Sequence, residues 1–215
     1  MDLWEQVDIY CERVGPEFWS EPLNAVTNAA FLIAALLAFA IWRRRTPDDW
    51  AGIGLIVVLF AIGVGSFLFH TFATRWAGLA DVIPIVIFIH VYLFVALNRF
   101  LDLRWWLALA IVIAFLVATV LFADTLFAPL VGSSAGYVPA LLAIFVVGAL
   151  FARKDGKLGA EVLLAGLVFL ASLTVRTLDE PFCQGVTFGI HFIWHILNSV
   201  VLFLLIRVLI LQRAG

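Results

Sequence analysis

Three histidines stand out because their types and spacing could bind a metal ion in a chain that is otherwise strongly apolar. His191 and His195 are four residues apart, so both imidazoles project from one face of a helix and can bind one ion. His70 has the same relation to Ser66 in the segment GVGSFLFH. Three imidazoles and a water molecule form the open tetrahedral site of catalytic zinc, which lowers the pKa of the bound water to about 7. The residues therefore predict a zinc site made of His70, His191 and His195.

Asp81 is the acid that accompanies these histidines, because it begins an apolar segment in ADVIP and can serve as the proton carrier. The motif HExxH does not occur, which excludes a zincin helix with its own glutamate base. A simpler interpretation remains open, since a histidine in a membrane helix often only bonds a neighbouring helix. His90 lies in the middle of a span without a polar partner nearby in the sequence, and it is expected to be a packed or pocket-lining residue. Ser66 could likewise serve only close helix packing beside Gly63 and Gly65.

The composition places these residues in a membrane. Hydrophobic residues make up 65% of the 215 residues and the mean hydropathy is +1.12, whereas soluble domains are about 45–50% apolar. The charged fraction is 13% and the net charge is −2, which gives no reason to expect a polyanionic partner. A disordered chain, a soluble enzyme and a nucleic-acid binder are excluded. We predict an all-α integral membrane protein that forms a single domain over residues 1–215.

Hydrophobic runs of spanning length predict a bundle of seven transmembrane helices. The expected segments are 22–42, 51–72, 79–98, 105–123, 137–152, 159–175 and 188–210. The fifth and sixth segments are short, so six spans are also conceivable. Seven are preferred because the polar stretch 153–157 separates those two segments. Residues 1–21 carry six acids and lack the basic region of a secretory signal, and we expect them to form an acidic extracytoplasmic tail.

The distribution of positive charge predicts the orientation in the membrane. With the N-terminus outside and the C-terminus in the cytoplasm, ten of the thirteen lysines and arginines fall on the inner side. In this orientation, His70 lies near the outer end of the second helix. Asp81, His191 and His195 lie near the outer ends of the third and seventh helices. At about 1.5 Å per residue, these four residues occupy one slab in the outer half of the membrane.

Three sequence blocks resemble the alkaline ceramidases and their wider superfamily of seven-span membrane hydrolases. That superfamily also contains the progestin and adiponectin receptors and lipid-remodelling enzymes of GPI anchors. The blocks are YCER followed by EPLNAVTN, GVGSFLFH followed by ADVIP, and HFIWHILNS, and the resemblance covers nearly the whole chain.

The resemblance implies a set of site residues and a reaction. Three histidines hold zinc in the family, and the matching positions here are His70, His191 and His195. The family serine and aspartate beside the zinc match Ser66 and Asp81. The implied reaction is attack of zinc-bound hydroxide on an amide carbonyl, which releases a sphingoid base and a fatty acid from ceramide. Zinc and the Ser66 hydroxyl would stabilise the oxyanion, and Asp81 would carry the water proton to the leaving amine.

The resemblance also implies a calcium site, because alkaline ceramidases bind calcium through an acidic N-terminal loop. Asp8, Glu12 and Glu21 resemble the carboxylate ligands, and the Tyr10 carbonyl resembles a backbone ligand. Oxygen ligands of this kind suit calcium. The loop is shorter than in the family, Asp8 fits only with a shift of one residue, and Val14 stands where a polar side chain can occur. The alternative is a solvated acidic tail that binds no ion.

Cys11 and Cys183 are the only cysteines, and both lie outside in the predicted orientation. That compartment is oxidising and allows a disulfide that ties the tail over the site. The resemblance implies the same bridge.

Two other functions remain open at this point. Ser66 and His70 could form a metal-free dyad of an intramembrane hydrolase, or the chain could be a seven-span receptor or lipid sensor of the same superfamily. The receptor is disfavoured because the inner loops are short and only eight residues follow Arg207. A retinal protein is excluded because retinal attaches through a Schiff base to a lysine within a helix. The only lysines here, Lys154 and Lys157, lie in a connection between helices.

The expected substrate is a membrane lipid, and the residues indicate no nucleic-acid or protein partner. An apolar pocket with its polar end in the outer leaflet suits a lipid amide or ester that enters sideways. The residues alone do not distinguish ceramide from other N-acyl or O-acyl lipids. The short loops suggest a bacterial cytoplasmic membrane as the location, with the site in its outer half.

Overall fold

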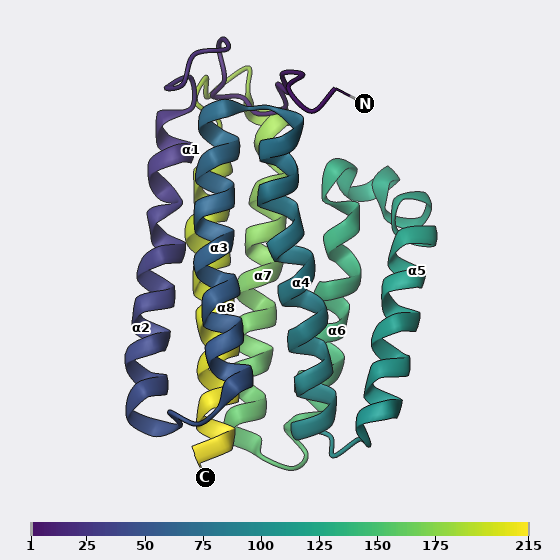
Figure 1. The fold of residues 1–215 in the computed structure, drawn as a ribbon. Coiled ribbons are helices and arrows are strands. Elements are labelled where there is room, and N and C mark those ends of the chain that lie inside the picture. Colours follow the sequence, from purple (N-terminus) through teal and green to yellow (C-terminus); the bar gives the residue numbers. More distant parts are fainter. Residues whose placement is uncertain (1, 215) are drawn as a thin grey trace.

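The computed structural model describes residues 2–214 and is an all-α bundle of long, roughly parallel and antiparallel helices (Figure 1). The predicted all-α membrane bundle is confirmed, and the predicted apolar segments match the observed helices to within a few residues at most ends. The elements are α1 (Pro22–Thr27), α2 (Ala29–Arg45), α3 (Trp50–Phe72), α4 (Arg75–Arg99), α5 (Trp105–Val131), the 3₁₀-helix η1 (Gly132–Tyr137), α6 (Val138–Phe151), α7 (Gly156–Phe182) and α8 (His191–Ala214).

Among residues 2–214, six helical stretches are long and apolar enough to cross a membrane. One of them, Trp105–Phe151, has 47 residues, although a single crossing needs only about 20. This stretch comprises α5, η1 and α6, and the chain reverses at η1 so that α5 and α6 run side by side in opposite directions (Figure 1). The expected break between the fifth and sixth predicted segments is present, because residues 152–155 separate α6 from α7.

Helix α8 lies at the centre of the bundle, where it packs against α2 and α7 and also contacts α3. Of its most apolar stretch, 61% is buried, compared with 17% for Trp105–Phe151 at the edge. The histidines at the start of α8 are therefore surrounded by protein rather than by lipid.

A close approach between α3 and α4 sets the position of one wall of the site. Gly65 of α3 lies against the backbone of Ala80 and Asp81 in α4, and a Cβ atom at Gly65 would overlap the Ala80 carbonyl group. Small residues allow membrane helices to pack this closely. The contact brings Ser66, the next residue of α3, beside the first turns of α4.

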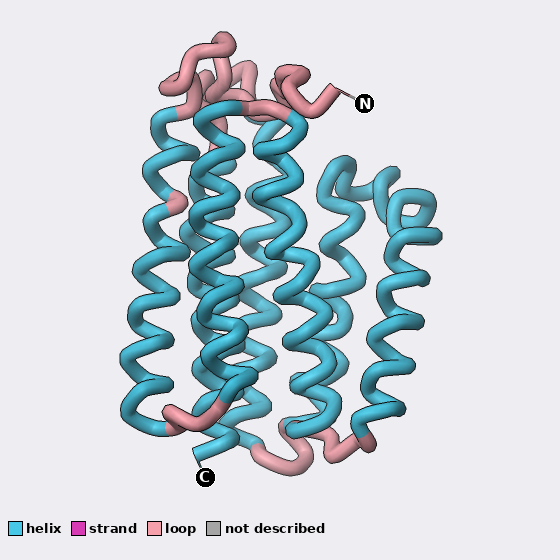
Figure 2. Tube along the Cα trace, in the orientation of Figure 1, coloured by secondary structure: helices cyan, strands magenta, loops and turns pink. Residues whose placement is uncertain are grey.

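The N-terminal segment, residues 2–21, lies over the end of the bundle where α3 ends and α8 begins, as the loops in Figure 2 show. Its backbone pairs with the connection between α3 and α4, where the Val7 amide donates to the Ala73 carbonyl at 2.7 Å. The predicted disulfide between Cys11 and Cys183 is confirmed and attaches the segment to the connection between α7 and α8. The tail is thus a fixed cover on the bundle.

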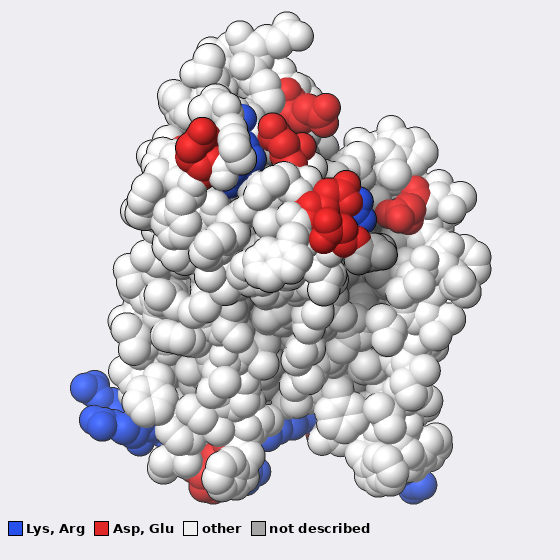
Figure 3. All heavy atoms as spheres, turned by 45° about the horizontal axis from the view of Figure 1, so that its top comes forward, with Lys and Arg blue, Asp and Glu red and all other residues white. Residues whose placement is uncertain are grey.

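The two ends of the bundle differ in charge. Acidic side chains gather at the end that carries the N-terminal segment, and lysines and arginines lie mainly along the opposite rim (Figure 3). At the opposite end, Asp49 caps α3 and accepts two hydrogen bonds from Arg99 at 2.7 and 2.8 Å. Burial alone would raise the pKa of Asp49, but Arg99 and the amides at the start of α3 hold it below its usual value.

Candidate metal centre

The three histidines predicted to bind zinc come together at the covered end of the bundle. His70 lies in the last turn of α3, and His191 and His195 lie in the first turns of α8. One ring nitrogen from each lies within 4.8 Å of the others, and the three side chains belong to residues that are only 1–2% exposed. The Nε2 atoms of His70 and His195 are 3.1 Å apart. Converging imidazoles in a buried position form a ligand set that a metal ion can bind.

The outer nitrogens of two of these rings are held by neighbouring oxygen atoms. His70 Nδ1 lies 2.6 Å from the Glu21 carboxylate, and His195 Nδ1 lies 2.9 Å from the Thr27 hydroxyl. The Thr27 hydroxyl donates its hydrogen to the Leu23 carbonyl, so it accepts the hydrogen of His195. These contacts leave both Nε2 atoms facing the common point, which is the arrangement found around metal-binding histidines.

Glu21 is an anion in this arrangement. Burial alone would raise the pKa of Glu21, but its hydrogen bonds with His70, Asn24 and Arg13 hold that pKa below its usual value. A carboxylate that accepts the Nδ1 hydrogen of His70 fixes the tautomer and the orientation of the ring.

Tyr10 covers the cluster with its side chain. Its ring stacks on that of His191 with the centroids 3.8 Å apart, and its centroid is 5.1 Å from that of His70. Burial raises the pKa of Tyr10, which therefore remains a neutral phenol. Arg176 of α7 is close enough to Tyr10 to interact with it electrostatically, and it lies over the ring of Trp194, 5.8 Å from its centroid. The sequence predicted a role for the Tyr10 carbonyl only and none for the Arg176 side chain.

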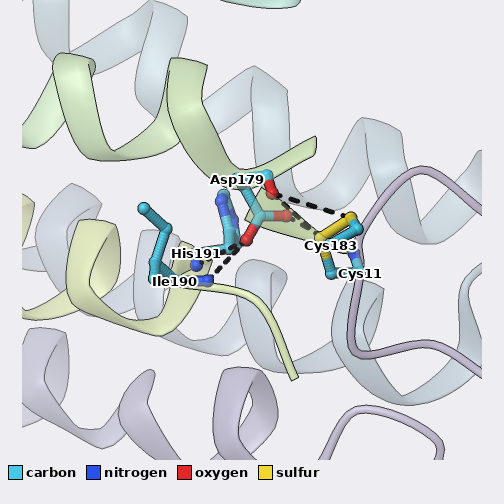
Figure 4. The surroundings of a disulfide bond; sticks show 5 residues. All are labelled: Cys11, Asp179, Cys183, Ile190 and His191. Carbon is cyan, nitrogen blue, oxygen red and sulfur yellow. Dashed lines mark hydrogen bonds between the residues drawn. A yellow bond between two sulfur atoms is a disulfide. The ribbon is translucent and has the colours of Figure 1, made fainter. Parts of the chain in front are cut away.

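Asp179 is a further site residue that sequence analysis missed. Its buried carboxylate accepts hydrogen bonds from the amides of Ile190 at 2.7 Å and His191 at 2.9 Å, and from Cys11 at 3.4 Å (Figure 4). A negative charge at the N-terminus of α8 is favourable. Asp179 thus anchors the first histidine of α8 and the disulfide together. The only sequence signal is an acid in TLDEPFC, just beyond the expected sixth span.

Ser66 and Asp81 lie beside the histidine cluster. Ser66 is buried, and both its side chain and His70 lie close enough to the half-buried carboxylate of Asp81 to interact with it. Both nitrogens of His70 contact other partners, Glu21 and His195. No nitrogen of His70 is therefore left to accept a proton from Ser66, which argues against the metal-free dyad.

The four residues expected to bind calcium do not converge. Asp8 is exposed, and the two oxygens of Glu12 cap α1 by accepting from the amides of Leu23 at 2.7 Å and Asn24 at 2.8 Å. The other two are also engaged, the Tyr10 carbonyl by the amide of Arg13 and Glu21 by three side chains. Within residues 2–214, the three histidines are the only group of side chains found with metal-binding geometry. In this arrangement the residues present do not fit a calcium ion, and the calcium prediction has no support from the structure. The alternative, a solvated acidic tail, is wrong for Glu12 and Glu21, which are buried.

The fold and the site together define a polytopic membrane protein with a buried three-histidine centre, a nearby acid and a serine at one end of the bundle. Residues 9–215 match the family model Ceramidase, and the chain therefore belongs to the ceramidase family. This confirms the resemblance seen in the sequence. Membership identifies the protein as an amidase-type hydrolase that acts on the C–N bond of ceramide-like lipids. A comparison with curated proteins finds no match.

Proposed function

We propose that the protein is a zinc-dependent lipid amidase of the membrane that cleaves ceramide or a closely related N-acyl lipid into an amine and a fatty acid. The convergence of His70, His191 and His195 in a buried position carries this proposal. The three imidazoles would hold zinc and leave a fourth position open. A zinc ion there supplies Lewis acidity and lowers the pKa of a water molecule to about 7.

Two residues of the chain would handle the proton and the developing charge. Asp81 takes the proton of the attacking water and gives it to the amide nitrogen as the C–N bond breaks. The Ser66 hydroxyl donates a hydrogen bond to the carbonyl oxygen, where negative charge develops. The position of both residues beside His70 supports these roles.

An apolar cavity below the histidines supports a lipid substrate. The cavity lies between α4, α5, α6, α7 and α8, and Tyr137 and Asn198 line it nearest the histidines. Asn198 follows His195 by three residues, so it lies about 4.5 Å further along α8. Most other lining side chains are aliphatic or aromatic, and Ala96 and Val147 line it further from the histidines. A cavity of this character suits an acyl chain whose amide group reaches the metal centre.

The reaction can be tested with purified protein incubated with a lipid extract and with synthetic ceramide, with and without a zinc chelator. We expect N-acyl lipids to be consumed, and amine and fatty acid to appear in equal amounts by mass spectrometry. The chelator should stop the reaction and added zinc should restore it. Consumption of O-acyl lipids while N-acyl lipids persist would contradict the proposal, as would activity that resists complete removal of zinc.

We further propose that the chain forms a single domain of seven spans, with α5 and α6 as separate crossings and the N-terminal segment outside. The reversal at η1 and the basic rim opposite the metal centre support this arrangement (Figure 3). Of the thirteen lysines and arginines, the three expected outside are Arg13, Arg75 and Arg176. In this orientation the metal centre lies in the outer half of the membrane. We propose that this membrane is a bacterial cytoplasmic membrane.

The orientation can be tested with an amine reagent that does not cross membranes, because Lys154 and Lys157 are the only lysines. In intact cells the reagent should leave both lysines unlabelled. The lysines should react once the membrane is opened. Labelling of Lys154 or Lys157 in intact cells would refute the orientation.

A further inference from the structure

Arg13 is a buried cation in the N-terminal segment, next to the metal centre. Its residue is 7% exposed, and its guanidinium donates to three oxygens. These are Glu21 Oε1 at 2.5 Å, the Gly15 carbonyl at 2.9 Å and the His70 carbonyl at 3.1 Å. One carboxylate and two backbone carbonyls are the kind of oxygen ligands that calcium takes in proteins. In this protein, the Arg13 guanidinium already hydrogen-bonds these three oxygens.

We infer that the Arg13 guanidinium takes the place of a calcium ion between the N-terminal segment and the metal centre, so that the protein needs no calcium. The guanidinium carries a permanent positive charge and has five N–H donors in a fixed plane. It offsets the charge of Glu21, which would otherwise be a buried carboxylate without a cation. It also joins residues 13–21 to the end of α3 without any ion.

The surroundings of Arg13 disfavour an additional calcium ion. A divalent cation at Glu21 would lie close to the guanidinium, and the repulsion would be strong because the pair is buried. The neighbouring carboxylate of Glu12 is not free to bind, since its two oxygens cap α1. The calcium site expected from the sequence is therefore disfavoured for a structural reason. The Arg13 guanidinium already neutralises Glu21, and Glu12 caps α1.

Arg13 also acts on the metal centre through Glu21. One Glu21 oxygen accepts from Arg13, and the other accepts from His70 Nδ1 and Asn24. Arg13 therefore holds the carboxylate that orients His70, and it contacts the His70 backbone directly. Arg13 is a positioning residue that touches neither substrate nor metal. Only this part of the inference rests on the proposed zinc centre.

The first experiment titrates the purified wild-type protein, with whatever zinc it retains, with calcium chloride in a buffer that is initially free of calcium. The titration reaches about 5 mM, above the range of weak extracellular calcium sites. We expect less than about 0.1 bound calcium per chain and a change in melting temperature below about 1 °C, because a ligand that does not bind the folded state cannot stabilise it. Binding of about one calcium per chain with a rise in melting temperature would overturn the inference.

The second experiment compares Arg13→Ala with Arg75→Ala. Arg75 also pairs with a glutamate of the N-terminal segment, Glu5 at 2.8 Å, but these side chains are 39% and 53% exposed. Arg13→Ala should weaken zinc binding about 10- to 100-fold, as expected when a partner of a metal-binding residue is lost. Arg75→Ala should bind zinc like the wild type, because exposed ion pairs contribute little.

Chemical rescue separates the lost charge from general damage. Guanidinium chloride at about 10 mM, far below the molar concentrations that denature proteins, should restore part of the zinc affinity of Arg13→Ala. It should leave wild type and Arg75→Ala unchanged. If Arg13→Ala does not fold, Arg13→Lys serves instead, since it keeps the charge and loses the planar donors. Equal zinc affinities for the Arg13 and Arg75 variants would overturn the positioning role. Absence of zinc from every variant would contradict the proposed function, while the calcium titration would still decide the calcium question.

Discussion

Replacement of His191 by alanine is expected to remove the bound metal and with it the hydrolysis of lipid amides. His191 supplies one of only three converging nitrogens, so its loss leaves two ligands, which is too few for a stable zinc site. Zinc contributes several kcal/mol of transition-state stabilisation. Activity should therefore fall by about 10³-fold or more, since each 1.4 kcal/mol is about tenfold in rate. Metal analysis should find about one zinc per chain in the wild type and far less in the variant.

His90 provides the matched control for this experiment. It is a histidine in α4 whose Nδ1 bonds the Val86 carbonyl of the same helix at 2.7 Å, and it does not belong to the cluster. His90→Ala should keep the zinc content and most of the activity. Equal zinc contents in His191→Ala and the wild type would show that the cluster is not the metal centre.

Replacement of Asp81 by asparagine should separate proton transfer from metal binding. The amide has nearly the shape of the carboxylate and can still contact Ser66, but it cannot take up the proton of the attacking water. We expect kcat to fall about 10²- to 10⁴-fold, the usual contribution of a general acid or base. The zinc content should stay at the wild-type level, because Asp81 is not one of the three converging residues.

Asp124→Asn is the corresponding control, because Asp124 is an exposed aspartate in α5. Its kcat and zinc content should match those of the wild type. A kcat for Asp81→Asn within a few-fold of the control value would exclude Asp81 as the proton carrier, given the size of effect expected. Loss of zinc from Asp81→Asn would instead assign to Asp81 a role in holding the metal.

The sequence by itself determined the helices and the depth of the histidines. Apolar runs predict membrane helices because the bilayer demands that backbone groups be bonded within each segment, which is a local requirement. The spacing of His191 and His195 places both on one face, because the helical repeat is fixed. The position of His70 near the outer end of its own segment then places it at the same depth as His191 and His195, because the rise per residue of a helix is fixed. These inferences need no knowledge of which helices are neighbours.

Only the tertiary structure decided what the charged residues at the covered end of the bundle do. Glu21 belongs with Arg13 and His70 rather than with calcium, and Asp179 belongs with the amides of Ile190 and His191. Glu21 and His70 are 49 residues apart, and the Cys11 amide reaches Asp179 across 168 residues. The sequence does not show whether a metal ion, a guanidinium group or a helix end neutralises a given carboxylate, because the carboxylate itself is the same in each case. The packing of distant segments selects the partner, because a buried charge is stable only where the fold supplies its counter-charge or hydrogen-bond donors.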